Sequence, residues 1–105
     1  MSRRSVILQW PINTNDDEGN VQQDWQNVCS LFGVLIAQSD SIKNESTGFA
    51  ETYEYMFYTM QWSEFLVVGN RILANGLPLY ISKILNHGRK IVIGLDSYVK
   101  EAGNG

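Results

Sequence analysis

The chain has 105 residues, the size of a single domain, which leaves no room for a separate substrate-binding domain. Its 44% hydrophobic and 18% charged residues are typical of a globular protein and exclude a disordered one. No apolar run approaches the ~18–20 residues of a membrane span, and a lone cysteine excludes an internal disulfide. We therefore expect one cytoplasmic domain over residues 1–105 that does not associate with a membrane, with 96–105 as a frayed tail.

The net charge of −3 conceals a segregation of charge along the chain. Residues 11–64 hold nine acids and one base, a net charge of −8, while the residues on both sides are mainly basic. The negative electrostatic field of such an acidic segment repels nucleic acid and attracts basic partners.

The first third of the chain predicts a strand and a helix. Residues 5–10 are apolar and β-branched up to Pro11, which indicates a strand, and residues 11–19 read as a polar loop. Asn20 can cap a helix that Gly33 would end. The helical face would consist of Val21, Trp25, Val28, Cys29 and Phe32.

The middle of the chain predicts a hairpin. Residues 34–42 pass from apolar to polar as a strand leaving the core would, and residues 43–48 have turn chemistry. Residues 49–62 are rich in Tyr and Phe, which favours a long second strand.

The last part of the chain predicts a split helix and a strand. Ser63 can cap a helix whose apolar stripe ends at residues 75–76, an Asn-Gly pair. Pro78 suits the first turn of a further helix, which would end at residues 86–88. Residues 90–95 then form a final strand.

This order of elements, β-α-β-β-αα-β, predicts an α+β protein. With right-handed crossovers it resembles a ferredoxin-like plait, a four-stranded antiparallel sheet with helices on one face. The first and third strands would be central, and the other face of the sheet would be open.

The acidic loop Asp16, Asp17 and Glu18 is the first candidate site. It could be a solvated loop, a contact for a basic partner or a cation site. The spaced carboxylates of a calcium loop are missing, so a solvated loop or a partner contact is favoured over metal.

The aromatic strand is the second candidate site. Strand geometry places Glu51, Tyr53, Tyr55 and Phe57 on one face, which we expect to be open. The opposite face would pack under the helices and consists of Met56, Tyr58, Met60 and Trp62. Exposed aromatic side chains can pack across strands, bind a protein or a second copy, or stack bases. The neighbouring acids disfavour nucleic acid.

Catalytic and cofactor chemistry finds little support. The single histidine, His87, is expected at a helix end and Cys29 in the core, so the two form no evident pair. No glycine-rich phosphate-binding motif occurs, and we expect neither a cofactor nor a metal.

The leading hypothesis is a small non-enzymatic protein-binding module that docks on a partner with a basic surface, in the manner of inhibitors and immunity or anti-defence proteins. Its predicted partner-binding residues are Asp16, Asp17, Glu18, Glu51, Tyr53, Tyr55 and Phe57. The alternative is a homodimeric ferredoxin-like regulatory domain that binds a small ligand.

Overall fold

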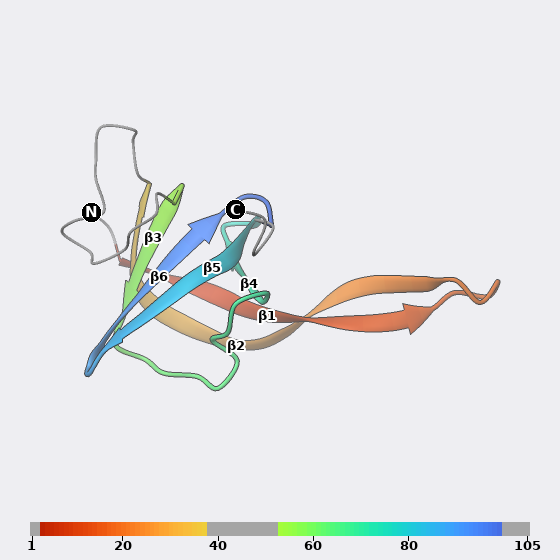
Figure 1. Ribbon diagram of the computed structural model, residues 1–105, viewed down its shortest axis with the longest axis horizontal. Coiled ribbons are helices and arrows are strands. Elements are labelled where there is room, and N and C mark those ends of the chain that lie inside the picture. Colours follow the sequence, from red (N-terminus) through yellow and green to blue (C-terminus); the bar gives the residue numbers. More distant parts are fainter. Residues whose placement is uncertain (1–2, 38–52, 100–105) are drawn as a thin grey trace.

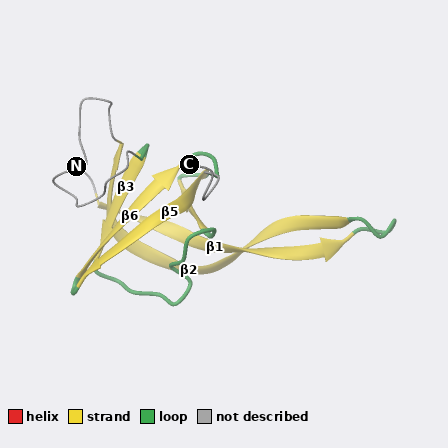
Figure 2. Ribbon diagram, viewed as in Figure 1, coloured by secondary structure: helices red, strands yellow, loops and turns green. Residues whose placement is uncertain are grey.

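The computed structural model describes residues 3–37 and 53–99, and these are all β (Figure 2). No helix occurs in either range, so the predicted α+β ferredoxin-like plait is wrong. Nor, within these ranges, is there a helix long and apolar enough to cross a membrane. The six strands are β1 (Arg3–Asn15), β2 (Val21–Ala37), β3 (Tyr55–Thr59), β4 (Arg71–Ala74), β5 (Leu77–His87) and β6 (Lys90–Asp96).

The strands close into a barrel in the order β1-β2-β3-β6-β5-β4, and every described pair is antiparallel. Closure leaves one face of each strand inside, where side chains must fill the interior. The buried side chains of this core include Val6, Leu8, Leu31, Phe57, Ile72, Leu79, Ile81, Ile93 and Leu95. β1 and β2 continue past the barrel wall as a long twisted hairpin (Figure 1).

The predicted helix over residues 21–32 is part of strand β2. The apolar residues that are spaced as on one face of a helix lie on the two opposite faces of this strand. Cys29 packs against the barrel core, whereas Phe32 is exposed. The register also shifts by one residue at Val28, because Leu8 pairs with Cys29 but the next residue of β1 pairs with Asn27. A bulge of this kind breaks the period of two that identifies a strand.

The two predicted C-terminal helices are also wrong. Residues 60–70 form a loop, and 71–74 and 77–87 form a hairpin. Asn75 and Gly76 connect its strands with positive φ values of 51° and 81°, the combination that a two-residue type I′ turn requires.

β5 contains a second bulge, which explains its helix-like pattern. The register between β5 and β6 shifts at Ser82, so Ile81 and Ile84 both pack against the barrel core although they are three residues apart. The His87 to Lys90 pair closes the following hairpin. These residues therefore end a strand and not a helix.

Four predicted strands coincide wholly or partly with observed ones. The strands at 5–10 and 90–95 are confirmed within β1 and β6, although β1 runs on through Pro11. The predicted strand at 34–42 is observed up to Ala37, and that at 49–62 is observed only over Tyr55–Thr59, as β3. The predicted turn at 43–48 lies outside the described residues.

The first residues of the expected tail make hydrogen bonds at the end of β6. Asp96 is buried at the end of β6, where its carboxylate accepts hydrogen bonds from the Ser82 hydroxyl at 2.8 Å and the Glu54 amide at 3.1 Å. The Glu54 carboxylate in turn accepts from the Ser97 amide at 2.8 Å. These bonds hold residues 96 and 97, where the chain leaves β6.

Gly33 has a packing role in place of the predicted helix cap. A Cβ at this position would collide with the Tyr58 carbonyl oxygen and approach the Phe57 ring at 2.9 Å. The absent side chain therefore allows β2 and β3 to close around the largest buried ring.

Candidate functional site: the acidic arm

The hairpin that leaves the barrel, residues 10–26, is called the arm. β1 pairs with β4 only at Ile7 to Gln9, and β2 pairs with β3 only from Gly33 onward. Along the arm the two strands pair with each other alone. An isolated two-stranded hairpin is only marginally stable in water, so the arm depends on contacts at its base.

One side of the base is a cation–aromatic cluster. The Arg71 guanidinium lies 4.3 Å from the centroid of the Trp25 ring and 5.9 Å from that of Tyr80. The two rings meet edge to face with centroids 5.8 Å apart. Arg71 Nε donates to Gln9 Oε1 at 2.7 Å, and Gln9 Nε2 donates to Asn27 Oδ1 at 2.7 Å. This cluster ties the arm to β4 and β5.

The other side of the base is covered by the loop at 60–70. Trp10 and Phe65 pack edge to face with their centroids 5.3 Å apart. The Trp10 indole N–H donates to Gln26 Oε1 at 3.0 Å. Asn70 fixes the loop by donating its side-chain amide to the Phe65 carbonyl at 2.7 Å. Aromatic contacts on both sides therefore set the direction in which the arm projects.

Asp16 organises the tip of the arm. Its Oδ1 accepts hydrogen bonds from the Asn20 and Glu18 amides at 2.8 and 2.9 Å. Chiefly through the bond from the Asn20 backbone, these contacts lower the pKa of Asp16 below its ordinary value, so the carboxyl stays ionised. Gly19 completes the turn with a φ of 84°. Asp17 and Glu18 are exposed beside it.

The arm is therefore a strongly negative element. Asp16, Asp17, Glu18 and Asp24 are its charged side chains, and it contains no Lys or Arg. Asp24 accepts a long hydrogen bond of 3.3 Å from the Thr14 hydroxyl across the strands. The carboxylates at the tip are consecutive and do not converge, and no group of potential metal ligands occurs among the described residues.

The predicted aromatic face is not on the surface. Phe57 is fully buried in the barrel core, Tyr53 is 2% exposed against Gly94, and Tyr55 is half-buried. Glu51 lies outside the described residues. β3 lies between β2 and β6 in the closed barrel, and Tyr55 and Phe57 point into its interior rather than toward an open sheet face.

The side chains predicted to be core on that strand are divided between environments. Met56 is fully buried in a small outer cluster with Tyr53 and Val92. Met60 and Trp62 are 74% and 60% exposed. The strand ends at Thr59, so a period-2 reading does not apply to the loop that follows.

The structure also reveals residues that the sequence reasoning missed. Trp25 was expected on the apolar face of a helix, and Trp10, Arg71 and Tyr80 were not among the predicted site residues, although together these four side chains hold the base of the arm. A tryptophan amid polar residues such as QQDWQN was the available signal, because such a ring needs a partner from elsewhere in the fold.

The remaining reactive side chains do not converge. His87 is exposed at the β5–β6 turn, and Cys29 lies 3.7 Å from the Ser63 hydroxyl. They belong to different parts of the barrel wall and have no hydrogen bond to each other. Comparison of the sequence with known protein families and with curated proteins finds no match.

Proposed function

We propose that the protein is a non-enzymatic binding module that docks on a basic protein surface through the tip of its arm. The observation that carries the proposal is a negative hairpin that projects from the barrel and is held at its base by aromatic contacts on both sides. The fixed direction of this hairpin lowers the entropy cost of binding.

The chemistry of the arm supports a basic protein as the partner. Its carboxylates would repel nucleic acid, and they would steer and orient a positively charged protein surface. Ile12 and the 70%-exposed Val21 add apolar surface next to the acids. The predicted contacts of Asp16, Asp17 and Glu18 are thus kept in this proposal. Tyr53 and Phe57 are not, because they are buried.

Site-specific photo-crosslinking tests the proposal. A photoreactive residue replaces Val21 on the arm in the full-length protein, and a control protein carries it at Val68, which is 63% exposed in the 60–70 loop. In cells that make the protein, we expect a protein with a basic surface to be captured from position 21 and not from 68. When crosslinking is repeated in lysates of these cells, capture should fall as salt rises, because salt screens exposed charges.

A charge-matched pair of variants makes this test specific. Asp17→Lys at the tip should abolish capture from position 21, while Glu64→Lys, an equal charge change on the exposed loop, should leave it intact. Equal capture at both positions, or equal losses in both variants, would contradict docking through the arm.

A further inference from the structure

A groove on the outside of the barrel carries positive charge, whereas the arm carries negative charge. It has a volume of about 380 Å³ and lies on the wall formed by β1, β2 and β3, next to the start of β6. Its lining combines apolar side chains with two cations, among them Phe32, Val34, Tyr58, Met60, Arg3 and Lys90. Among the described residues that line it, none is acidic. The groove therefore fits an anionic group that is accompanied by apolar atoms.

The register of the sheet explains how these residues meet. Arg3 pairs with Val34, and Val34 pairs with Tyr58 on the next strand, so the three side chains lie in one row across the wall. Lys90 Nζ lies 5.2 Å from the centroid of the Tyr58 ring. Burial raises the pKa of Tyr58, so its phenol remains neutral and does not offset the two cations.

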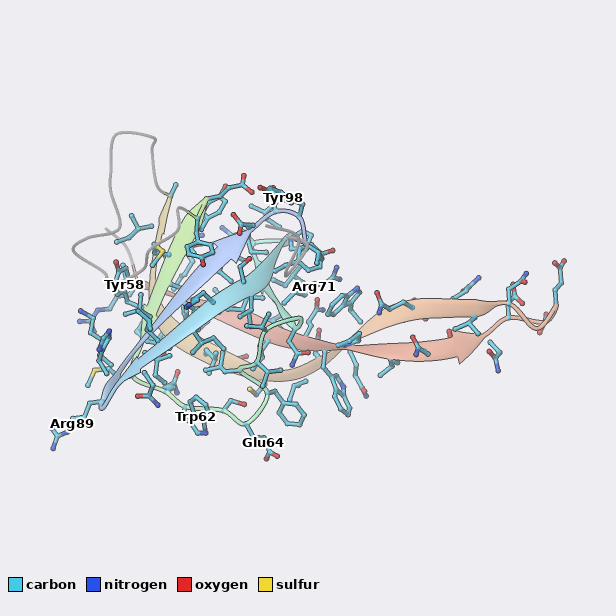
Figure 3. The ribbon with its side chains drawn as sticks, in the orientation of Figure 1. Tyr58, Trp62, Glu64, Arg71, Arg89 and Tyr98 are labelled. Carbon is cyan, nitrogen blue, oxygen red and sulfur yellow. The ribbon has the colours of Figure 1, made fainter. Side chains whose placement is uncertain are left out.

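The groove and the arm lie at opposite ends of the molecule. Arg3 begins β1, and the tip of the arm follows the last residue of the same strand, Asn15. Thirteen residues of extended strand span roughly 40 Å. Figure 3 shows Tyr58 and Arg89 at the end of the barrel farthest from the arm. The tip of a chain therefore cannot reach the groove of the same chain.

We propose that the acidic tip of one copy docks into the groove of a second copy, so that molecules associate head to tail. This rests on the proposed function and names the basic partner as another molecule of the same chain. Asp17 and Glu18 would meet Arg3 and Lys90. The exposed Val21 would cover part of the apolar groove floor.

The geometry defines the kind of assembly. Tip and groove are different surfaces, so the contact is heterologous and propagates into a chain, or into a ring if the rotation between copies closes. A contact made by a hairpin tip is small, and small interfaces are weak. Association should therefore appear over roughly 1 µM to 1 mM protein and weaken with salt.

A charge-swap experiment with the full-length protein tests the proposal. The tip variant is Asp17→Lys with Glu18→Lys, and the groove variant is Arg3→Glu with Lys90→Glu. In sedimentation velocity across that concentration range, the wild type should form oligomers. Each variant alone should associate at least about tenfold more weakly, because like charges would then face each other.

The mixture of the two variants is the decisive sample. A positive tip then meets a negative groove, and a negative tip meets a positive groove, so oligomers containing both chains should reappear. The chain that carries all four substitutions should also self-associate. Glu64→Lys with Val68→Lys, both at exposed positions of the 60–70 loop away from the tip and the groove lining, serves as a control for added positive charge. Circular dichroism of each variant confirms that the barrel is folded.

Two outcomes would overturn the proposal. One is a wild type that stays monomeric throughout the range, and the other is an oligomer that the mixed variants fail to restore. Either result would leave the proposed function standing if position 21 still captured a different basic protein in cells. If position 21 captured no protein at all, both the proposed function and the head-to-tail association would be contradicted.

Discussion

The barrel and the arm share two strands but are stabilised differently. In the barrel, β1 and β2 have neighbours on both sides, and their inward side chains fill a core that includes Leu8 and Leu31. In the arm the same strands have only each other, and Val21 is 70% exposed. Core burial therefore determines whether the protein folds, whereas side-chain contacts at the base determine where the arm points.

The largest expected effect follows from removing the biggest ring in the barrel. Phe57→Ala should lower the free energy of unfolding by about 3–5 kcal/mol, because it leaves a cavity in a closed core. Urea denaturation measures this loss. Phe32→Ala is the matched control, since Phe32 is 49% exposed on the same barrel wall. Similar losses of unfolding free energy in both variants would contradict the placement of Phe57 inside the barrel and Phe32 outside it.

The close approach of β2 to β3 gives the next effect. Gly33→Ala should cost about 1–3 kcal/mol of unfolding free energy, because the new methyl group meets the Tyr58 carbonyl and the Phe57 ring. Ser30→Ala, at an exposed position of the same strand, should change stability by no more than about 0.5 kcal/mol. A neutral Gly33→Ala would show that these strands can move apart.

A smaller effect should separate the arm from the barrel. Trp25→Ala removes the ring that contacts both Arg71 and Tyr80, and we expect it to lower the stability of the arm by about 1–2 kcal/mol. Hydrogen exchange should increase mainly at the arm amides, with the barrel amides less affected. Trp62→Ala, which truncates a 60%-exposed ring in the loop, is the control. Uniform acceleration across the barrel would indicate that the arm is part of the cooperative core.

The smallest effect is confined to the tip and depends on pH. The pKa of Asp16 is lowered from its ordinary value of 3.8, so its bonds to the Asn20 and Glu18 amides are fully formed above that value. They should be lost as pH falls through the lowered pKa. NMR shifts of these two amides should follow that titration while the barrel amides stay constant.

Asp16→Asn should reproduce the low-pH shifts of the tip at neutral pH, and Asp17→Asn should leave them unchanged. Global stability should change little in either variant, because the tip has no contact with the barrel core. Titration of these amides at the ordinary carboxyl pKa would contradict the hydrogen-bonded turn.

Strong local signals identified parts of the fold. The β-branched residues at 5–10 and 90–95 indicated strands, and both were observed. The Asn75-Gly76 pair was recognised as a break, although it is a hairpin turn rather than the end of a helix. The acids at 16–18 were expected in a loop, and they form the tip of the arm.

Other features could not be predicted from local pattern. The bulges at Val28 and Ser82 each add one residue and so convert strand spacing into spacing that resembles a helix. The arrangement around Arg71 joins residues of β1, β2, β4 and β5, far apart in the chain. The prediction of an exposed aromatic face was wrong, because the sequence of β3 alone does not show which of its two faces points into the closed barrel.

The sequence by itself determined the charge segregation and the places near residues 16–20 and 75–76 where the chain reverses. Tertiary structure decided that the sheet closes, that Tyr53 and Phe57 are buried, and that the acids from 16 to 24 lie on a projecting arm. The physical reason is that charge and turn chemistry are properties of neighbouring residues. Closure, bulges and burial depend on hydrogen bonds between strands that only the complete fold brings together.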